Sequence, residues 1–98
     1  METNVHALEQ RAAESAALVR YDEVAQILTG KREARAVDGV AWVQSTCAAL
    51  GVPGLSTYGV ARVHFTELIE KSAQASSMKG NPIRLTEQEM IAILTRAL

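Results

Sequence analysis

Few side chains in this sequence could bind a metal ion, and they lie far apart along the chain. There are two histidines, His6 and His64, and one cysteine, Cys47. A protein metal site needs three or four ligands, and on a helix these usually stand at i, i+3 or i+4. His64 and Glu67 have such a spacing. A single pair does not complete a site, so we expect structural roles for both histidines and no metal bound by this chain alone.

Cys47 and Lys79 are the remaining candidates for nucleophilic or binding chemistry. Cys47 falls in the apolar stripe of a predicted helix and has no base or cation at helical spacing to activate it, so we expect a core cysteine. Lys79 lies in a predicted loop, where a lysine is usually solvated. No Gly-rich phosphate loop follows a strand, and no carboxylate pair stands out for acid–base work. The sequence therefore predicts no catalytic residue.

The composition predicts a helical domain, or part of one, in a chain of 98 residues. Apolar residues make up 48% and aromatic residues only 4%, while Ala and Leu abound, which favours helix over strand. The net charge of -1 and the lack of a basic face argue against nucleic acid as a partner. A single cysteine excludes an internal disulfide and fits a cytoplasmic location, and we see no signal peptide.

One uncharged stretch, 39–61, has the length of a membrane span, which needs roughly 20 apolar residues. Gly51 and Pro53 interrupt it near the middle, and its Ser, Thr and Gln side chains would need partners in lipid. We therefore expect no membrane association, and interpret the stretch as a buried helix followed by a buried, uncharged loop.

Hydrophobic periodicity predicts an all-α fold, a small bundle of about five helices. The predicted helices are 2–12, 17–29, 35–50, 61–75 and 87–97, separated by irregular segments that include 51–59 and 76–85. The predicted apolar faces are Leu18, Tyr21, Ala25 and Leu28, widened by Val24 and Ile27, on the second helix, and Val40, Val43, Cys47 and Leu50 on the third. Leu55 and Tyr58 are expected to anchor the loop 51–59. Thr86 and Glu89 form a capping box at the start of the last helix.

Three segments have distinctive sequences: Ala-Ser-Ser-Met-Lys-Gly-Asn-Pro at 75–82, Leu-Val-Arg-Tyr-Asp-Glu-Val-Ala at 18–25 and Leu-Gly-Val-Pro-Gly at 50–54. They resemble segments of iron-containing (group III) alcohol dehydrogenases, whose wider superfamily includes maleylacetate reductase and lactaldehyde reductase. Ala-Ser-Ser-Met-Lys-Gly-Asn-Pro at 75–82, then Leu-Thr-Glu at 85–87 and a terminal helix, resembles the family's C-terminus. Residues 18–25 resemble its Arg-Tyr-x-Glu-Val-Ala helix, and residues 50–60 resemble its Leu-Gly-Ile-Pro loop. The resemblance covers essentially the whole chain, and Gly-Asn-Pro with its flanking helices is the most specific part.

The resemblance implies that the chain 1–98 is a partial C-terminal helical domain. Residues 1–4 look like the end of the family's His-Gly-x-x-x-Ala-x-x-Leu-Pro-x-Val-Met-x-x-Asn segment, whose histidine binds the metal. The family's one aspartate and three histidine ligands, and the Gly-rich domain that holds NAD(P), would then all lie upstream. His6 and His64 match no ligand position. A gene remnant, a misplaced start and an expressed fragment all remain compatible with this interpretation.

In related enzymes the loop matching 76–82 faces the interdomain cleft, near the nicotinamide and the substrate. The resemblance thus implies Ser77 and Met78 as cleft-lining residues, with Lys79, Gly80 and Asn81 shaping the loop. An intact family enzyme would use Fe2+ or Zn2+ to polarise the carbonyl and NAD(P) to carry the hydride. The family often has acidic residues where its fourth helix begins, whereas this chain has Ala-Arg-Val-His at 61–64.

Two hypotheses about function follow. In the first, the chain is an inactive part of an NAD(P)-linked alcohol dehydrogenase and forms one wall of its cleft. In the second, it is a non-enzymatic helical interaction module. Both predict a homo-oligomer in isolation, because an apolar helical face without a partner drives association. A small independent enzyme is disfavoured, since no set of catalytic residues is present.

Overall fold

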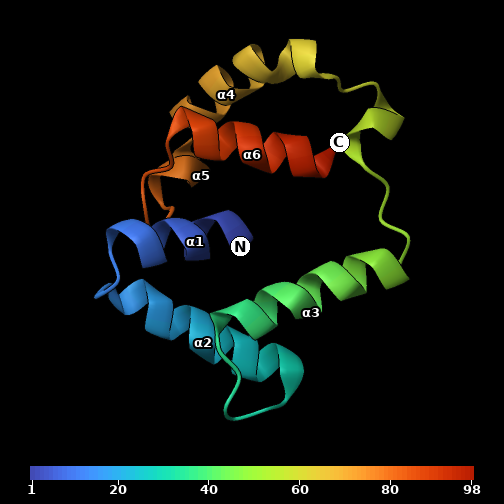
Figure 1. The fold of residues 1–98 in the computed structure, drawn as a ribbon. Helices are drawn as coiled ribbons and strands as arrows, with labels where there is room; N and C mark the ends of the chain where they lie inside the picture. The colour runs from blue at the N-terminus through green and yellow to red at the C-terminus, as the bar shows by residue number, and fades with distance from the viewer. The chain divides into compact units, whose positions relative to one another are not determined.

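The computed structural model describes residues 1–98 and confirms the all-α prediction (Figure 1). The α-helices are α1 (Glu2–Arg11), α2 (Ala16–Thr29), α3 (Ala36–Ala49), α4 (Phe65–Gln74), α5 (Ser76–Lys79) and α6 (Glu87–Ala97). Two short 3₁₀ helices, η1 (Leu55–Tyr58) and η2 (Arg62–His64), precede α4. The chain forms two compact units, unit 1 (Met1–Val52) and unit 2 (Pro53–Leu98), which are described separately.

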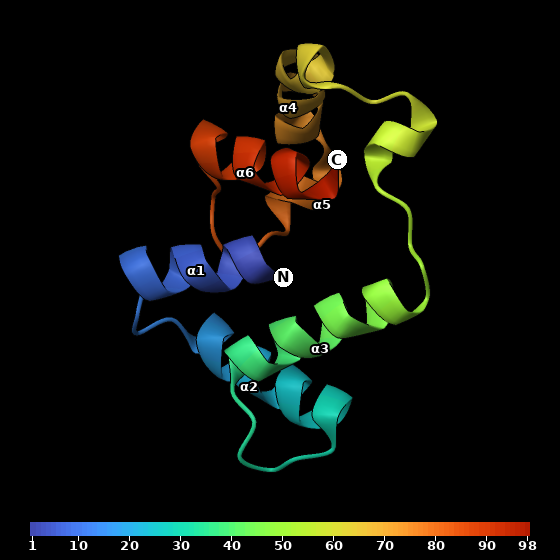
Figure 2. The same cartoon turned by 45° about the vertical axis from the view of Figure 1, so that its right-hand side comes forward.

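Unit 1 is built on a close approach of α2 and α3, which lie side by side in both ribbon views (Figures 1 and 2). Ala25 of α2 is fully buried where it meets Gly39 of α3. A Cβ atom added at Gly39 would lie 2.9 Å from the Cβ and 3.0 Å from the Cα of Ala25. Only glycine allows backbones to approach this closely, so Gly39 has a packing role that outweighs its poor helix propensity.

Carboxylates satisfy the N-terminus of α3. Asp22 of α2 accepts a hydrogen bond from the Ala36 backbone N–H at 2.8 Å, and its other oxygen lies 3.1 Å from Arg35 Nε. Asp38, in the first turn of α3, accepts from the Arg35 N–H at 2.9 Å. The first N–H groups of a helix have no partner within it, and negative charge is favoured at that end. Asp22 therefore links α2 to the start of α3.

Helix α1 has only a weak apolar periodicity, yet it contributes several of the most buried side chains of unit 1. Val5, Ala7 and Leu8 are buried, and the helix contacts both α2 and α3. The Asn4 side-chain amide donates to the Tyr21 hydroxyl at 3.0 Å, which adds a polar link to α2. The short, mixed pattern of this helix reflects contact with two partners rather than one.

In unit 2, α4 packs on α6, and Phe65 and Ile69 are its buried apolar residues. The predicted capping box is confirmed, because Thr86 and Glu89 exchange hydrogen bonds at the start of α6. At the other end of α6, the Ser56 hydroxyl donates to the Leu98 carbonyl at 2.6 Å. Gly54 packs so closely against the Leu98 carbonyl that any side-chain atom there would collide with it.

Apart from shifts of one residue at helix ends and the short η1 inside the predicted loop 51–59, two segments differ from the sequence-based prediction. Helix α4 begins at Phe65 rather than near residue 61, because residues 62–64 form η2, and His64 Nδ1 accepts from the Ala61 N–H at 3.0 Å. The segment 76–85, predicted to be irregular, contains the single-turn helix α5. Both differences concern one turn of 3₁₀ or α-helix, for which periodicity gives no signal.

The prediction that 39–61 is largely buried is wrong in this structure, and so is that of a core Cys47. Cys47 is exposed, Leu50 is 75% exposed and Tyr58 is 71% exposed. The buried residues of α3 are Ala36 and Gly39, near its N-terminus, so the crossing with α2 covers only that end.

The predicted apolar face of α2 is narrower in the structure. Val24 and Ile27 are exposed, so the residues of this face that are at least partly buried are Leu18, Tyr21, Ala25 and Leu28. No helix has both the length and the apolar character required to cross a membrane.

Substituting Gly39→Val tests the helix crossing. The added atoms would meet the Ala25 backbone, so the helices must separate, and we expect unit 1 to lose about 1–3 kcal/mol of unfolding free energy. The matched control is Ala48→Val at an exposed position of α3, which should cost no more than about 0.7 kcal/mol, the propensity term. Urea denaturation followed by circular dichroism measures both, and equal losses would contradict the crossing.

Candidate functional site

The residue types that bind metals do not converge anywhere in the chain. No group of three or more His, Cys, Asp or Glu side chains is placed to hold a metal ion. His6 is exposed on α1, and Cys47 is exposed on α3. The pair His64 and Glu67 is engaged elsewhere, since His64 Nδ1 accepts from the Ala61 N–H and Glu67 pairs with Lys71 at 2.5 Å. His64 therefore caps a 3₁₀ turn.

The candidate residues Ser77, Met78, Lys79, Gly80 and Asn81 form one compact turn in unit 2. The first three belong to α5, and backbone hydrogen bonds from Gly80 to Ser77 and from Asn81 to Met78 close the turn. The Asn81 side-chain amide donates to the Ile83 carbonyl at 2.7 Å. Met78 and Asn81 are half-buried, while the other three are exposed. The turn is thus fixed by its own backbone and leaves Ser77 and Lys79 accessible.

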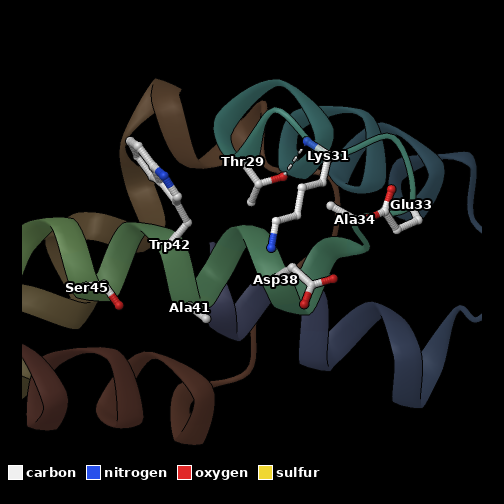
Figure 3. Close-up of a pocket in the computed structure, with 8 residues that line it drawn as sticks. All are labelled: Thr29, Lys31, Glu33, Ala34, Asp38, Ala41, Trp42 and Ser45. Atoms are coloured by element: carbon white, nitrogen blue, oxygen red, sulfur yellow. Dashed lines mark hydrogen bonds between the residues drawn. The ribbon is translucent and has the colours of Figure 1, made fainter.

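A hollow of about 480 Å³ lies in unit 1, between the α2–α3 connection and the exposed side of α3 (Figure 3). Its lining combines a tryptophan, an ammonium group, two carboxylates and two hydroxyls. The lining residues are Thr29, Lys31, Glu33, Ala34, Asp38, Ala41, Trp42 and Ser45. It is the candidate site of this chain, because polar and aromatic groups converge on one concave surface.

The connection that forms one wall of the hollow is held at both ends. Helix α2 ends at Gly30, whose φ of 70° is the left-handed conformation that glycine adopts without strain. The Thr29 hydroxyl donates to the Ala25 carbonyl at 2.8 Å and accepts from the Lys31 N–H at 3.2 Å. Ala34 is buried, and its N–H donates to the Lys31 carbonyl at 3.2 Å. The backbone of Lys31 is therefore fixed while its side chain extends freely.

The opposite wall is one face of α3. Asp38, Ala41, Trp42 and Ser45 stand at i, i+3, i+4 and i+7, so they share that face. Trp42 is 40% exposed, and its indole N–H and the Ser45 hydroxyl have no hydrogen-bond partner. The face therefore offers an aromatic surface with unused donors.

Charge is distributed unevenly along the hollow. Figure 3 shows the Lys31 side chain extending toward α3, with its ammonium between Trp42 and Asp38 in this view and Glu33 at the end away from Trp42. The Lys31 ammonium has neither a hydrogen bond nor an ion pair. Asp38 is already engaged by the Arg35 N–H, at the positive end of the α3 dipole. The end near Trp42 therefore has unused positive and donor groups.

Neither Lys31 nor Trp42 belongs to a recognised motif, so the residue types of the sequence did not predict this hollow. Two signals in the sequence point to it. Gly30 ends α2 and directs the chain back toward α3, and the only tryptophan of the chain stands four residues after Asp38. A lone Trp in a helix of mostly apolar residues usually packs in a core, so its exposure is visible only in three dimensions.

Comparison of the chain with family models, with curated proteins and with solved structures found no match. The resemblance to iron-containing alcohol dehydrogenases therefore depends on the residues of the three segments described above. In this structure several of these residues support the fold: Tyr21 binds Asn4, Asp22 caps α3, and Gly54 and Ser56 contact Leu98.

Proposed function

We propose that this chain is a helical part of an iron-dependent, NAD(P)-linked alcohol dehydrogenase, that it forms one wall of the alcohol- or aldehyde-binding cleft, and that it is inactive alone. The resemblance of the segments 18–25, 50–60 and 75–82 supports this function, as does the helical fold in which they lie. The residues that would line the cleft are Ser77 and Met78, on a turn shaped by Lys79, Gly80 and Asn81.

The residues of this chain do not form a binding site for the metal ion or for the NAD(P) that such a reaction uses. An iron or zinc site needs at least three convergent ligands, and the histidines, carboxylates and cysteine form no such group. The family's NAD(P) domain places a Gly-rich turn between a strand and a helix, and this chain has no strand. Under this proposal another part of the protein supplies both groups, and no chemical step is assigned to residues of this chain.

The exposed apolar side chains support the part of the proposal in which these helices pack against further protein. Buried apolar residues number eight, and four of them are alanines. By contrast, Val19, Ile27, Leu50 and Val63 are all more than half exposed. Large apolar side chains left this exposed are expected where a surface packs against further protein. The single cysteine is compatible with a cytoplasmic location.

A dehydrogenase assay tests the proposal of inactivity. The purified 98-residue chain, supplied anaerobically with Fe2+ or with Zn2+, NAD or NADP and a series of primary alcohols, should reduce no nicotinamide above the protein-free rate. The physical reason is the lack of a ligand set to polarise the substrate oxygen. Metal-dependent, saturable reduction that follows the protein through purification would overturn the proposal.

The second candidate function is a helical interaction module, favoured by two exposed apolar residues of α2. Val19 and Ile27 are 59% and 81% exposed, and the exposed Glu23 stands midway between them along the helix. Each apolar side chain would be covered in an association of two chains, because exposed apolar surface drives association. This function needs no catalytic residue.

Multi-angle light scattering at high concentration tests this association. We expect a homodimer or larger oligomer for the natural chain and a shift toward monomer for Ile27→Lys, since a charge in an apolar contact is left unpaired. Gln10→Lys, at an exposed position of α1, adds the same charge elsewhere and should not change the mass. A monomer at every concentration, or equal effects of both variants, would contradict the interaction module.

A further inference from the structure

The hollow of unit 1 has the groups needed to bind a small ligand, and this does not depend on the proposed dehydrogenase function. Its walls are fixed, because the Lys31 backbone is held by Thr29 and Ala34 while the facing residues stand on α3. The backbone around the hollow is therefore preformed, as in most small-molecule sites, and binding would order mainly the Lys31 side chain.

The unused groups near Trp42 determine the class of ligand. The Lys31 ammonium, the Trp42 indole N–H and the Ser45 hydroxyl all lack a partner, and all three can donate to an oxygen anion. The half-exposed face of Trp42 is suited to a flat apolar ring, because offset stacking of aromatic rings is favourable. A ligand that uses both features combines a planar ring with an anionic oxygen group.

The two carboxylates that line the hollow do not exclude an anionic ligand. Asp38 accepts from the Arg35 N–H and lies in the first turn of α3, where the helix dipole offsets negative charge. Glu33 is exposed and lies at the end of the hollow away from Trp42 (Figure 3). An anion placed between Lys31 and Trp42 thus meets the ammonium before either carboxylate.

We propose that the hollow lined by Lys31, Trp42 and Ser45 is a binding site for small aromatic carboxylates. The ring lies against the Trp42 indole, and the carboxylate accepts from the Lys31 ammonium. The hollow is open to solvent on one side, so we expect a dissociation constant on the order of 1–10 mM for a ligand as small as benzoate.

Trp42 is the only tryptophan, so its indole N–H gives one signal in a proton–nitrogen correlation spectrum, and benzoate is the probe. Titration should move this signal saturably. Acetate lacks the ring and benzyl alcohol lacks the charge, and both should move it less at equal concentration. Benzylammonium carries the opposite charge, so it tests whether the site prefers an anion or a cation. Saturation by benzylammonium at lower concentration than by benzoate would overturn the assignment.

Two matched variants separate the site from general surface charge. Lys31→Met should raise the benzoate dissociation constant about two- to fivefold, the range of an exposed ion pair. Arg32→Met removes the same charge from the neighbouring residue, which does not line the hollow, and should leave the constant unchanged. Both positions are exposed, and circular dichroism confirms that the variants fold. Equal effects of the two variants, or no saturable shift at all, would refute the site.

Discussion

Unit 1 depends on the close approach of α2 and α3 at Ala25 and Gly39, two of its smallest residues. Where two backbones lie this near, the residues around the crossing also come within hydrogen-bonding distance. Asp22 precedes Ala25 by three residues and Ala36 precedes Gly39 by three, and their side-chain and backbone groups meet at 2.8 Å. The crossing and this cap together hold the connection between the helices, and so position Lys31 over the exposed face of α3.

The features that could be predicted from the sequence are those determined within a few residues. Ser15 and Gly30 delimit α2, and Thr86 with Glu89 begins α6, because each acts on backbone groups of its own turn. What could not be predicted was which apolar residues are covered. Cys47 and Leu50 have the spacing of a core stripe, but burial depends on whether another helix reaches that end of α3. Periodicity identifies a face and cannot identify its partner.

The candidate site could likewise be predicted from the sequence only in part. Its four α3 residues share a face by spacing that is plain in the sequence, and Gly30 signals the turn that faces them. Their meeting with Lys31 requires the helix crossing, a contact between residues far apart in the chain. The segments that resemble iron-containing alcohol dehydrogenases, by contrast, contribute caps and close contacts within each unit, such as Asp22 on α3 and Ser56 on Leu98. The structural roles of these residues are therefore a second explanation, besides the resemblance, for the presence of those residue types.

The proposed function requires that these helices hold no metal by themselves. Equilibrium dialysis of the purified chain, against Fe2+ under anaerobic conditions and against Zn2+, measures this most directly. The distribution of His6, His64 and Cys47 over separate helices predicts bound metal well below one ion per chain. One tightly held ion per chain, lost on substitution of His64→Ala, would contradict it.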